Sequence, residues 1–172
     1  MQKIKPVITH TKTTADEQYF KIVRKIMDVF SILVRVVPVY ILNKRIERPI
    51  YDSMGKQVYE LALMQRHYTD VINGKKPDFS RMAPPGFKIH ERAELTSILK
   101  TSDEYFFKVT YTVEDWNSVI YDVMGRKSSA YGIVQMMIEH ETFHQGQFAA
   151  IGYMTGIKLP KTWANEISFH FR

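Results

Sequence analysis

The sequence contains no cysteine, and this absence excludes several kinds of chemistry at once. A disulfide scaffold, a cysteine-ligated zinc site, an iron–sulfur cluster and a thiol nucleophile all need a residue that the chain does not have. A thiol used in any reaction would therefore come from a second substrate. The absence also agrees with a reducing compartment, and we expect a cytoplasmic protein.

Long apolar runs are scarce as well. Residues 1–12 are polar and have no apolar core of the length that an export signal needs. The longest apolar run, residues 26–42, contains Asp28, Arg35 and Pro38, and it is at the short limit for a bilayer span. We expect a buried helix followed by a bend, and no membrane segment.

The sequence does have ample material for a core, because 45% of its 172 residues are apolar and 13% are aromatic. This length predicts a single domain over residues 1–172, with residues 1–13 as an N-terminal extension. The net charge of +6 comes from residues 1–50, which hold ten Lys and Arg against four Asp and Glu. Lys21, Arg24 and Lys25 have the spacing of a solvated helix face, so we expect no nucleic-acid binding.

Capping residues and apolar spacing predict four helices. Thr14 and Glu17 have the spacing of a capping box, whereas Asn73-Gly74 and Gly156 are typical of helix ends. Residues 109–127 mix β-branched residues with turn formers and are read as irregular, with room for a short strand or turn. The predicted fold is all-α, a four-helix bundle with one long crossover connection. Its helices are predicted at residues 14–36, 53–72, 89–108 and 128–155.

His140 and His144 are the strongest candidates for chemistry. Histidines four residues apart share a helix face and can bind one metal ion with two imidazoles. Burying two imidazoles without partners costs about 1–3 kcal/mol each, so both need a ligand or a hydrogen-bond partner. The alternative to a metal is a pair of core histidines that other groups satisfy. The two histidines belong to a predicted inward stripe: Ile133, Met137, His140, His144, Gln147 and Ile151.

The same five residues, H-E-T-F-H, also match the H-E-x-x-H signature of zinc proteases, in which the glutamate is the general base. Such a protease needs a third protein ligand, and Glu166 is the one carboxylate that follows His144. No convincing edge strand precedes the helix to hold a peptide. The protease is therefore a weaker alternative.

Residues 138–147, I-E-H-E-T-F-H-Q-G-Q, resemble the histidine-containing stretch of the DinB/YfiT-like superfamily. G-I-K-L-P at residues 156–160, an aromatic at Trp163, and S-M-G-K-Q-V-Y-E at residues 53–60 are similar to further segments of that family. The resemblance covers residues 14–163 in element order. It implies an up-down-down-up bundle in which three side chains hold a divalent metal. Some relatives are hydrolases, or transferases and isomerases that use small thiols.

Two departures from the family pattern change the expected ligand set. The position that is usually histidine on the second helix is Glu60, and the second member of a frequent histidine pair is Gln145. The resemblance then implies a metal held by Glu60, His140 and His144. Two histidines and a carboxylate suit zinc, nickel, manganese or iron. The alternatives are a degenerate site with Glu60 on the surface, or His67 in place of Glu60 if the register differs.

Other polar residues are weaker candidates. Glu141 points roughly 100° away from His140, so we expect it to support a ligand or to face solvent. Gln147 could orient a ligand or a bound water, and Tyr131, Arg126 and Tyr59 could contact a substrate. No catalytic side chain is assigned beyond a metal-bound water.

The function expected from these features is metal-dependent hydrolysis or thiol transfer on a small molecule. A low-molecular-weight thiol is a candidate cosubstrate, because the chain supplies no thiol of its own. The resemblance also implies a homodimer. The alternative is a non-catalytic, stress-associated binding protein whose metal site is degenerate.

Overall fold

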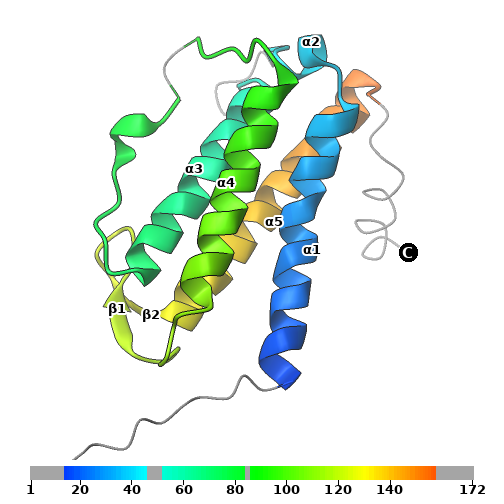
Figure 1. The fold of residues 1–172 in the computed structure, drawn as a ribbon. Helices are drawn as coiled ribbons and strands as arrows, with labels where there is room; N and C mark the ends of the chain where they lie inside the picture. Colours follow the sequence, from blue (N-terminus) through cyan, green and yellow to red (C-terminus); the bar gives the residue numbers. More distant parts are fainter. Residues whose placement is uncertain (1–13, 46–51, 84–85, 158–172) are drawn as a thin grey trace, which may run out of the picture.

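A computed structural model describes residues 14–45, 52–83 and 86–157, which form a bundle of four long helices (Figure 1). The first helix runs up, the next two run down and the last runs up (Figure 1). The predicted all-α bundle is confirmed. The four helices are α1 (Thr14–Val36), α3 (Met54–Ile72), α4 (Arg92–Thr110) and α5 (Ala130–Thr155).

The long crossover follows from the parallel course of α3 and α4. The chain leaves the lower end of α3 at Asn73, climbs the outside of the bundle and enters α4 at its upper end (Figure 1). This connection carries a short 3₁₀ turn, η1 (Phe79–Arg81). The predicted crossover connection, between the helices expected at residues 53–72 and 89–108, is therefore present and contains this one turn.

Side-chain and glycine caps fix the helix ends near the positions predicted. Ser53 Oγ accepts a hydrogen bond from the backbone N–H of Lys56 at 3.2 Å and begins α3. Gly156 ends α5 with φ of 68°, a left-handed conformation that glycine adopts without a Cβ clash. The start of α4 was predicted three residues too early, because Glu94 Oε1 accepts the N–H of Glu91 at 3.1 Å and places the helix start there.

Two small elements complete the chain. Helix α2 (Val39–Leu42) follows Pro38 and was not predicted, because four residues are too few to show a periodic pattern. Strands β1 (Val119–Tyr121) and β2 (Lys127–Ser129) pair antiparallel below the bundle. Strand β1 lies within residues 109–127, where a short strand or turn was expected. Strand β2 includes residues 128 and 129, which were predicted to begin the fourth helix, so α5 begins two residues later, at Ala130.

The bundle interior contains two apolar clusters with a polar layer between them. Phe30, Leu61, Leu99 and Phe148 belong to the upper cluster, near α2. Val23, Tyr68, Phe106 and Met137 belong to the lower cluster, near the hairpin. Between these clusters, α3, α4 and α5 each contribute polar side chains. The polar layer consists of Gln65, Ser102, Asp103, His140, Glu141 and His144.

Each helix in the described part of the chain is too short or too polar to cross a lipid bilayer.

Candidate metal site

The histidine pair lies in the middle of α5, in the polar layer. The ring centroids of His140 and His144 are 4.7 Å apart, with the rings nearly perpendicular. Tyr68 of α3 lies edge-on to His140, with 6.2 Å between centroids. On the α1 side, the Gln145 amide donates a hydrogen bond to the carbonyl of Ile26 at 3.1 Å. The structure therefore brings the two predicted imidazoles together and fixes their helix against two neighbours.

The surroundings of this pair favour neutral imidazoles. Burial lowers the pKa of His140, and burial together with the nearby His140 lowers the pKa of His144 to about 4, although Gln147 opposes the second shift. Both rings are then neutral at pH 7, which is the state that binds a metal. His144 Nδ1 and Gln147 Oε1 are buried and have no hydrogen-bond partner among the described residues. The type and state of these donors fit a divalent metal.

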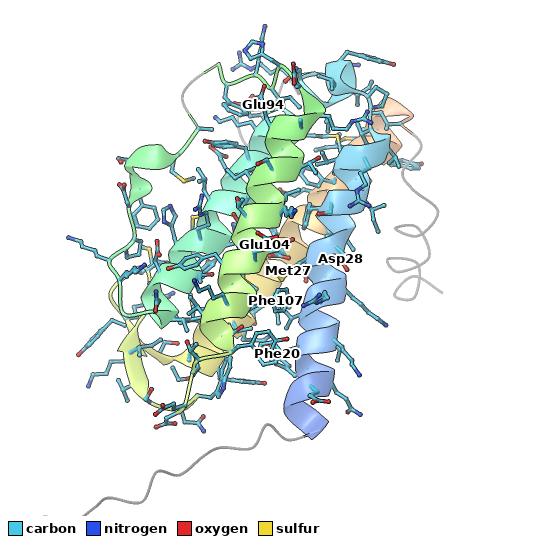
Figure 2. All side chains as sticks on the ribbon, in the orientation of Figure 1. Phe20, Met27, Asp28, Glu94, Glu104 and Phe107 are labelled. Atoms are coloured by element: carbon cyan, nitrogen blue, oxygen red, sulfur yellow. The ribbon has the colours of Figure 1, made fainter. Side chains whose placement is uncertain are left out.

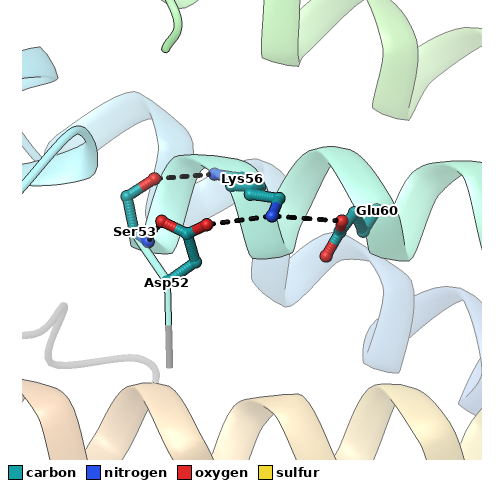
Figure 3. A network of polar contacts seen from close by, with 4 residues as sticks. All are labelled: Asp52, Ser53, Lys56 and Glu60. Carbon is teal, nitrogen blue, oxygen red and sulfur yellow. Dashed lines mark hydrogen bonds and ion pairs between the residues drawn. The ribbon is translucent and has the colours of Figure 1, made fainter. Parts of the chain in front are cut away.

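Glu60 has a different partner in the structure. Its Oε1 atom lies 3.8 Å from Lys56 Nζ, and the same ammonium donates to Asp52 Oδ2 at 2.9 Å (Figure 3). Burial raises the pKa of Glu60, and Lys56 opposes that rise. Within residues 14–45, 52–83 and 86–157, no three His, Asp or Glu side chains are grouped so that they could hold one ion. Glu60 as the third ligand therefore stays a prediction.

The predicted inward stripe of α5 needs a correction. Ile133, Met137 and Ile151 are buried as predicted, whereas His140, His144 and Gln147 are half-buried at the side of the stripe. Glu141 continues the buried stripe instead, with an exposed fraction of 1%, so the expectation that it could face solvent is wrong. An α-helix has 3.6 residues per turn, so His140 and Glu141, three and four residues after Met137, both lie near the inward direction. Spacing alone therefore does not predict which of the two is buried.

The polar layer contains two carboxyl groups, of which Glu141 is buried and the second is half-buried. Asp103 of α4 is the other, and its Oδ1 accepts a hydrogen bond from Gln65 Nε2 at 2.9 Å. Burial raises the pKa of Asp103 to about 6, and burial and the charge of Asp103 raise the pKa of Glu141 well above its usual value. Sequence reasoning missed Asp103 and Gln65, because neither stands in a motif and their partners lie on other helices.

The three candidates for substrate contact have partners outside the histidine pair. Tyr131 is 50% exposed in the first turn of α5, where its ring stacks on Tyr19 at 5.6 Å. The Arg126 guanidinium is in the hairpin turn and donates to Asp122 Oδ2 at 2.7 Å. Tyr59 packs against Phe87, with 4.6 Å between ring centroids. Glu166 and Trp163 lie outside the described residues.

A groove of about 470 Å³ between α1 and α4 reaches the polar layer from outside. Met27 of α1 and Asp103 and Phe107 of α4 line it. Figure 2 labels Asp28 and Glu104, which lie on the two helices that form its sides. Its volume is within the range of pockets that bind small molecules.

Comparison with known proteins supports the fold. No protein-family model matches the sequence, and no curated protein matches it significantly. Among solved structures, a DinB-like protein from Bacillus cereus ATCC 10987 superposes with a TM-score of 0.69. The match covers 84% of this chain and 95% of that one, at 13% sequence identity. The chain therefore has a DinB-like fold, as the sequence resemblance predicted.

Proposed function

We propose that this protein binds a divalent metal through His140, His144 and Glu60 and acts on a small molecule. The observation that carries the proposal is the histidine pair itself. Two neutral, half-buried imidazoles lie 4.7 Å apart in a polar layer between two apolar clusters. Four-helix bundles build metal centres from inward side chains of this kind on facing helices.

The polar layer needs an explanation beyond packing. Replacing apolar residues with polar ones in the middle of a core lowers stability unless every polar group finds a partner. Here His144 Nδ1 and both carboxylate oxygens of Glu141 have none among the described residues. Unsatisfied buried groups of this kind are frequent where a protein binds an ion or a ligand.

Two histidines and one carboxylate would suit Zn²⁺, Ni²⁺, Mn²⁺ or Fe²⁺ and leave positions for other ligands. Such an ion, when bound, polarises a substrate oxygen or lowers the pKa of a bound water. Glu60 would have to exchange its contact with Lys56 for the metal. Gln147, which interacts with His144, would orient a ligand or water bound beside the pair.

A small substrate agrees with the dimensions of the described cavities. The α1–α4 groove of about 470 Å³ has the size of a small-molecule site, and it reaches Asp103 of the polar layer but is not lined by His140 or His144. Because the chain has no cysteine, thiol transfer would require a low-molecular-weight thiol as cosubstrate. The proposed reaction is either hydrolysis or thiol transfer. We also propose that the protein is a homodimer, as the resemblance implies.

A non-catalytic binding protein is the second candidate, and the Lys56–Glu60 contact favours it. If that ion pair persists in solution, the bundle keeps two histidines without a third ligand. The zinc protease receives no such support. Glu141, its required base, is 1% exposed in the core and has a raised pKa, so its carboxyl group does not face a substrate cleft.

Elemental analysis of protein purified without added metal tests the metal proposal. We expect close to one equivalent of a divalent transition metal in the parent and a strong loss in His144→Ala. His90→Ala is the matched control, because His90 is exposed and outside the polar layer. A His144→Ala variant that retains as much metal as the parent would refute the assignment.

Activity is tested separately. Metal-loaded and metal-stripped protein would be compared on electrophiles with several biological thiols, and on simple esters and amides. We expect turnover that requires both the metal and His144. Equal inactivity of the two forms throughout would favour the binding protein.

A further inference from the structure

A second polar pocket lies on the outside of the bundle, away from the histidine pair. It has a volume of about 330 Å³ and is formed by α3, the α3–α4 connection and α4. Leu63, His67 and Asp70 line it from α3, and Tyr105 lines it from α4. The proposed metal site uses none of these residues.

His67 is the unexplained group in this pocket. Its side chain is 4% exposed, and neither ring nitrogen has a hydrogen-bond partner among the described residues. Burial lowers its pKa although Asp70 and Asp78 oppose the shift, so the ring is neutral at pH 7, with one N–H donor and one acceptor. A buried imidazole with both nitrogens unsatisfied costs free energy that an apolar side chain would not. Such a group in a pocket wall indicates a ligand that hydrogen-bonds to it.

Phe79 covers this imidazole. The centroids of the His67 and Phe79 rings are 4.6 Å apart. Phe79 belongs to the three-residue turn η1 and is itself 45% exposed. Phe79 therefore packs on the His67 ring from a short surface turn, while His67 also lines the pocket.

Charges of both signs surround the same space. Arg66 and Lys75 are positive, and Asp70 and Asp78 are negative. The Tyr105 hydroxyl donates to Asp70 Oδ1 at 2.7 Å and accepts from Lys75 Nζ at 3.4 Å, so it links one group of each sign. A ligand with a single charge would meet repulsion from half of these groups, whereas a ligand that carries both charges would be complementary.

We propose that this pocket binds a small zwitterion of the amino-acid class. Its ammonium group would lie toward Asp70 and Asp78, and its carboxylate toward Arg66 and Lys75. The neutral ring of His67 would supply the further hydrogen bond. This site is independent of the metal site, and either proposal can fail without the other.

The test titrates the full-length, metal-free protein with each of the common L-amino acids and with glycine betaine. Calorimetry measures affinity, and NMR of ¹⁵N-histidine-labelled protein follows the His67 ring. We expect at least one amino acid to bind with a dissociation constant of roughly 1 mM or tighter. The His67 resonances should shift, while those of exposed His90 should stay in place.

Variants assign the binding to this pocket. His67→Phe, which keeps an aromatic ring beside Phe79, and Asp70→Asn should each weaken binding at least about tenfold. His144→Ala should leave the affinity unchanged. If His67→Phe does not fold, Asp70→Asn and the His67 resonances still decide the question.

Three results would overturn the proposal. One is the absence of binding by every amino acid up to roughly 10 mM. Another is parental affinity in Asp70→Asn or His67→Phe. The third is a His67 resonance that responds to Zn²⁺ alone and to no amino acid, which would assign a metal to the pocket instead.

Discussion

Asp103→Asn should stabilise the protein at neutral pH, although it removes a charged side chain that is hydrogen-bonded in the native state. Burial raises the pKa of Asp103 from 3.8 to about 6. At a pH between these two pKa values, Asp103 is protonated in the folded chain and ionised in the unfolded chain. The free energy of unfolding therefore falls as the pH rises through this range. Above about pH 6 both states are ionised, and the folded state carries the full penalty of a buried carboxylate.

The size of the expected gain in stability follows from the difference between the two pKa values of Asp103. About two pKa units at 1.36 kcal/mol each correspond to roughly 3 kcal/mol, which is an upper bound for a residue that keeps some solvent contact. Asparagine retains the Oδ1 acceptor for Gln65 Nε2 and lacks the charge. For a chain of this length, the gain in melting temperature at pH 8 would therefore be at most roughly 6–12 °C. The gain should shrink as the pH falls below 6 and vanish near pH 4.

Urea denaturation of parent and variant at several pH values between 5 and 8 measures this difference. Glu104→Gln is the matched control, because Glu104 is the next residue on α4 and is exposed. Its effect should stay within about 0.5 kcal/mol, as for most surface substitutions. The reasoning would be refuted by an Asp103→Asn variant that is less stable than the parent at pH 8. It would also be refuted by a gain in stability that does not depend on pH.

Three further predictions concern caps and the third ligand. Ser53→Ala removes the acceptor for the Lys56 N–H and should lower the free energy of unfolding by about 1 kcal/mol, whereas an unchanged urea midpoint would contradict the cap. Gly156→Ala places a Cβ at φ of 68° and should cost about 1 kcal/mol by the same assay, and a gain in stability would count against the left-handed end of α5. Glu60→Gln should weaken metal binding by at least about tenfold in calorimetry without lowering the melting temperature. Parental metal affinity in that variant would remove Glu60 from the ligand set.

The helices could be predicted from sequence where local chemistry determines them. The end of α3 at Ile72 and the end of α5 next to Gly156 follow from residues whose effect is local. The start of α4 was misplaced because Glu91, a poor N-cap by type, owes its position to a contact with Glu94. A side-chain contact of this kind can be recognised only when the positions of both side chains are known.

The candidate site could be predicted only in part, for a related reason. The i, i+4 spacing was enough to bring His140 and His144 together, because both lie on one rigid helix. Glu141 of α5 and Asp103 of α4 interact electrostatically because the bundle brings both into the polar layer, and the periodicity of one helix carries no information about the others. The contact between Glu60 and Lys56 likewise depends on which rotamer each side chain adopts.

The most direct test of the central claim is anomalous diffraction from a crystal of the full-length protein soaked in Zn²⁺, with data collected on both sides of the zinc absorption edge. We predict one strong anomalous peak within coordination distance of a ring nitrogen of His140 and of His144, with a Glu60 oxygen as the third protein ligand. No peak at the histidine pair, in a crystal that has taken up zinc elsewhere, for example at His67, would contradict the metal site.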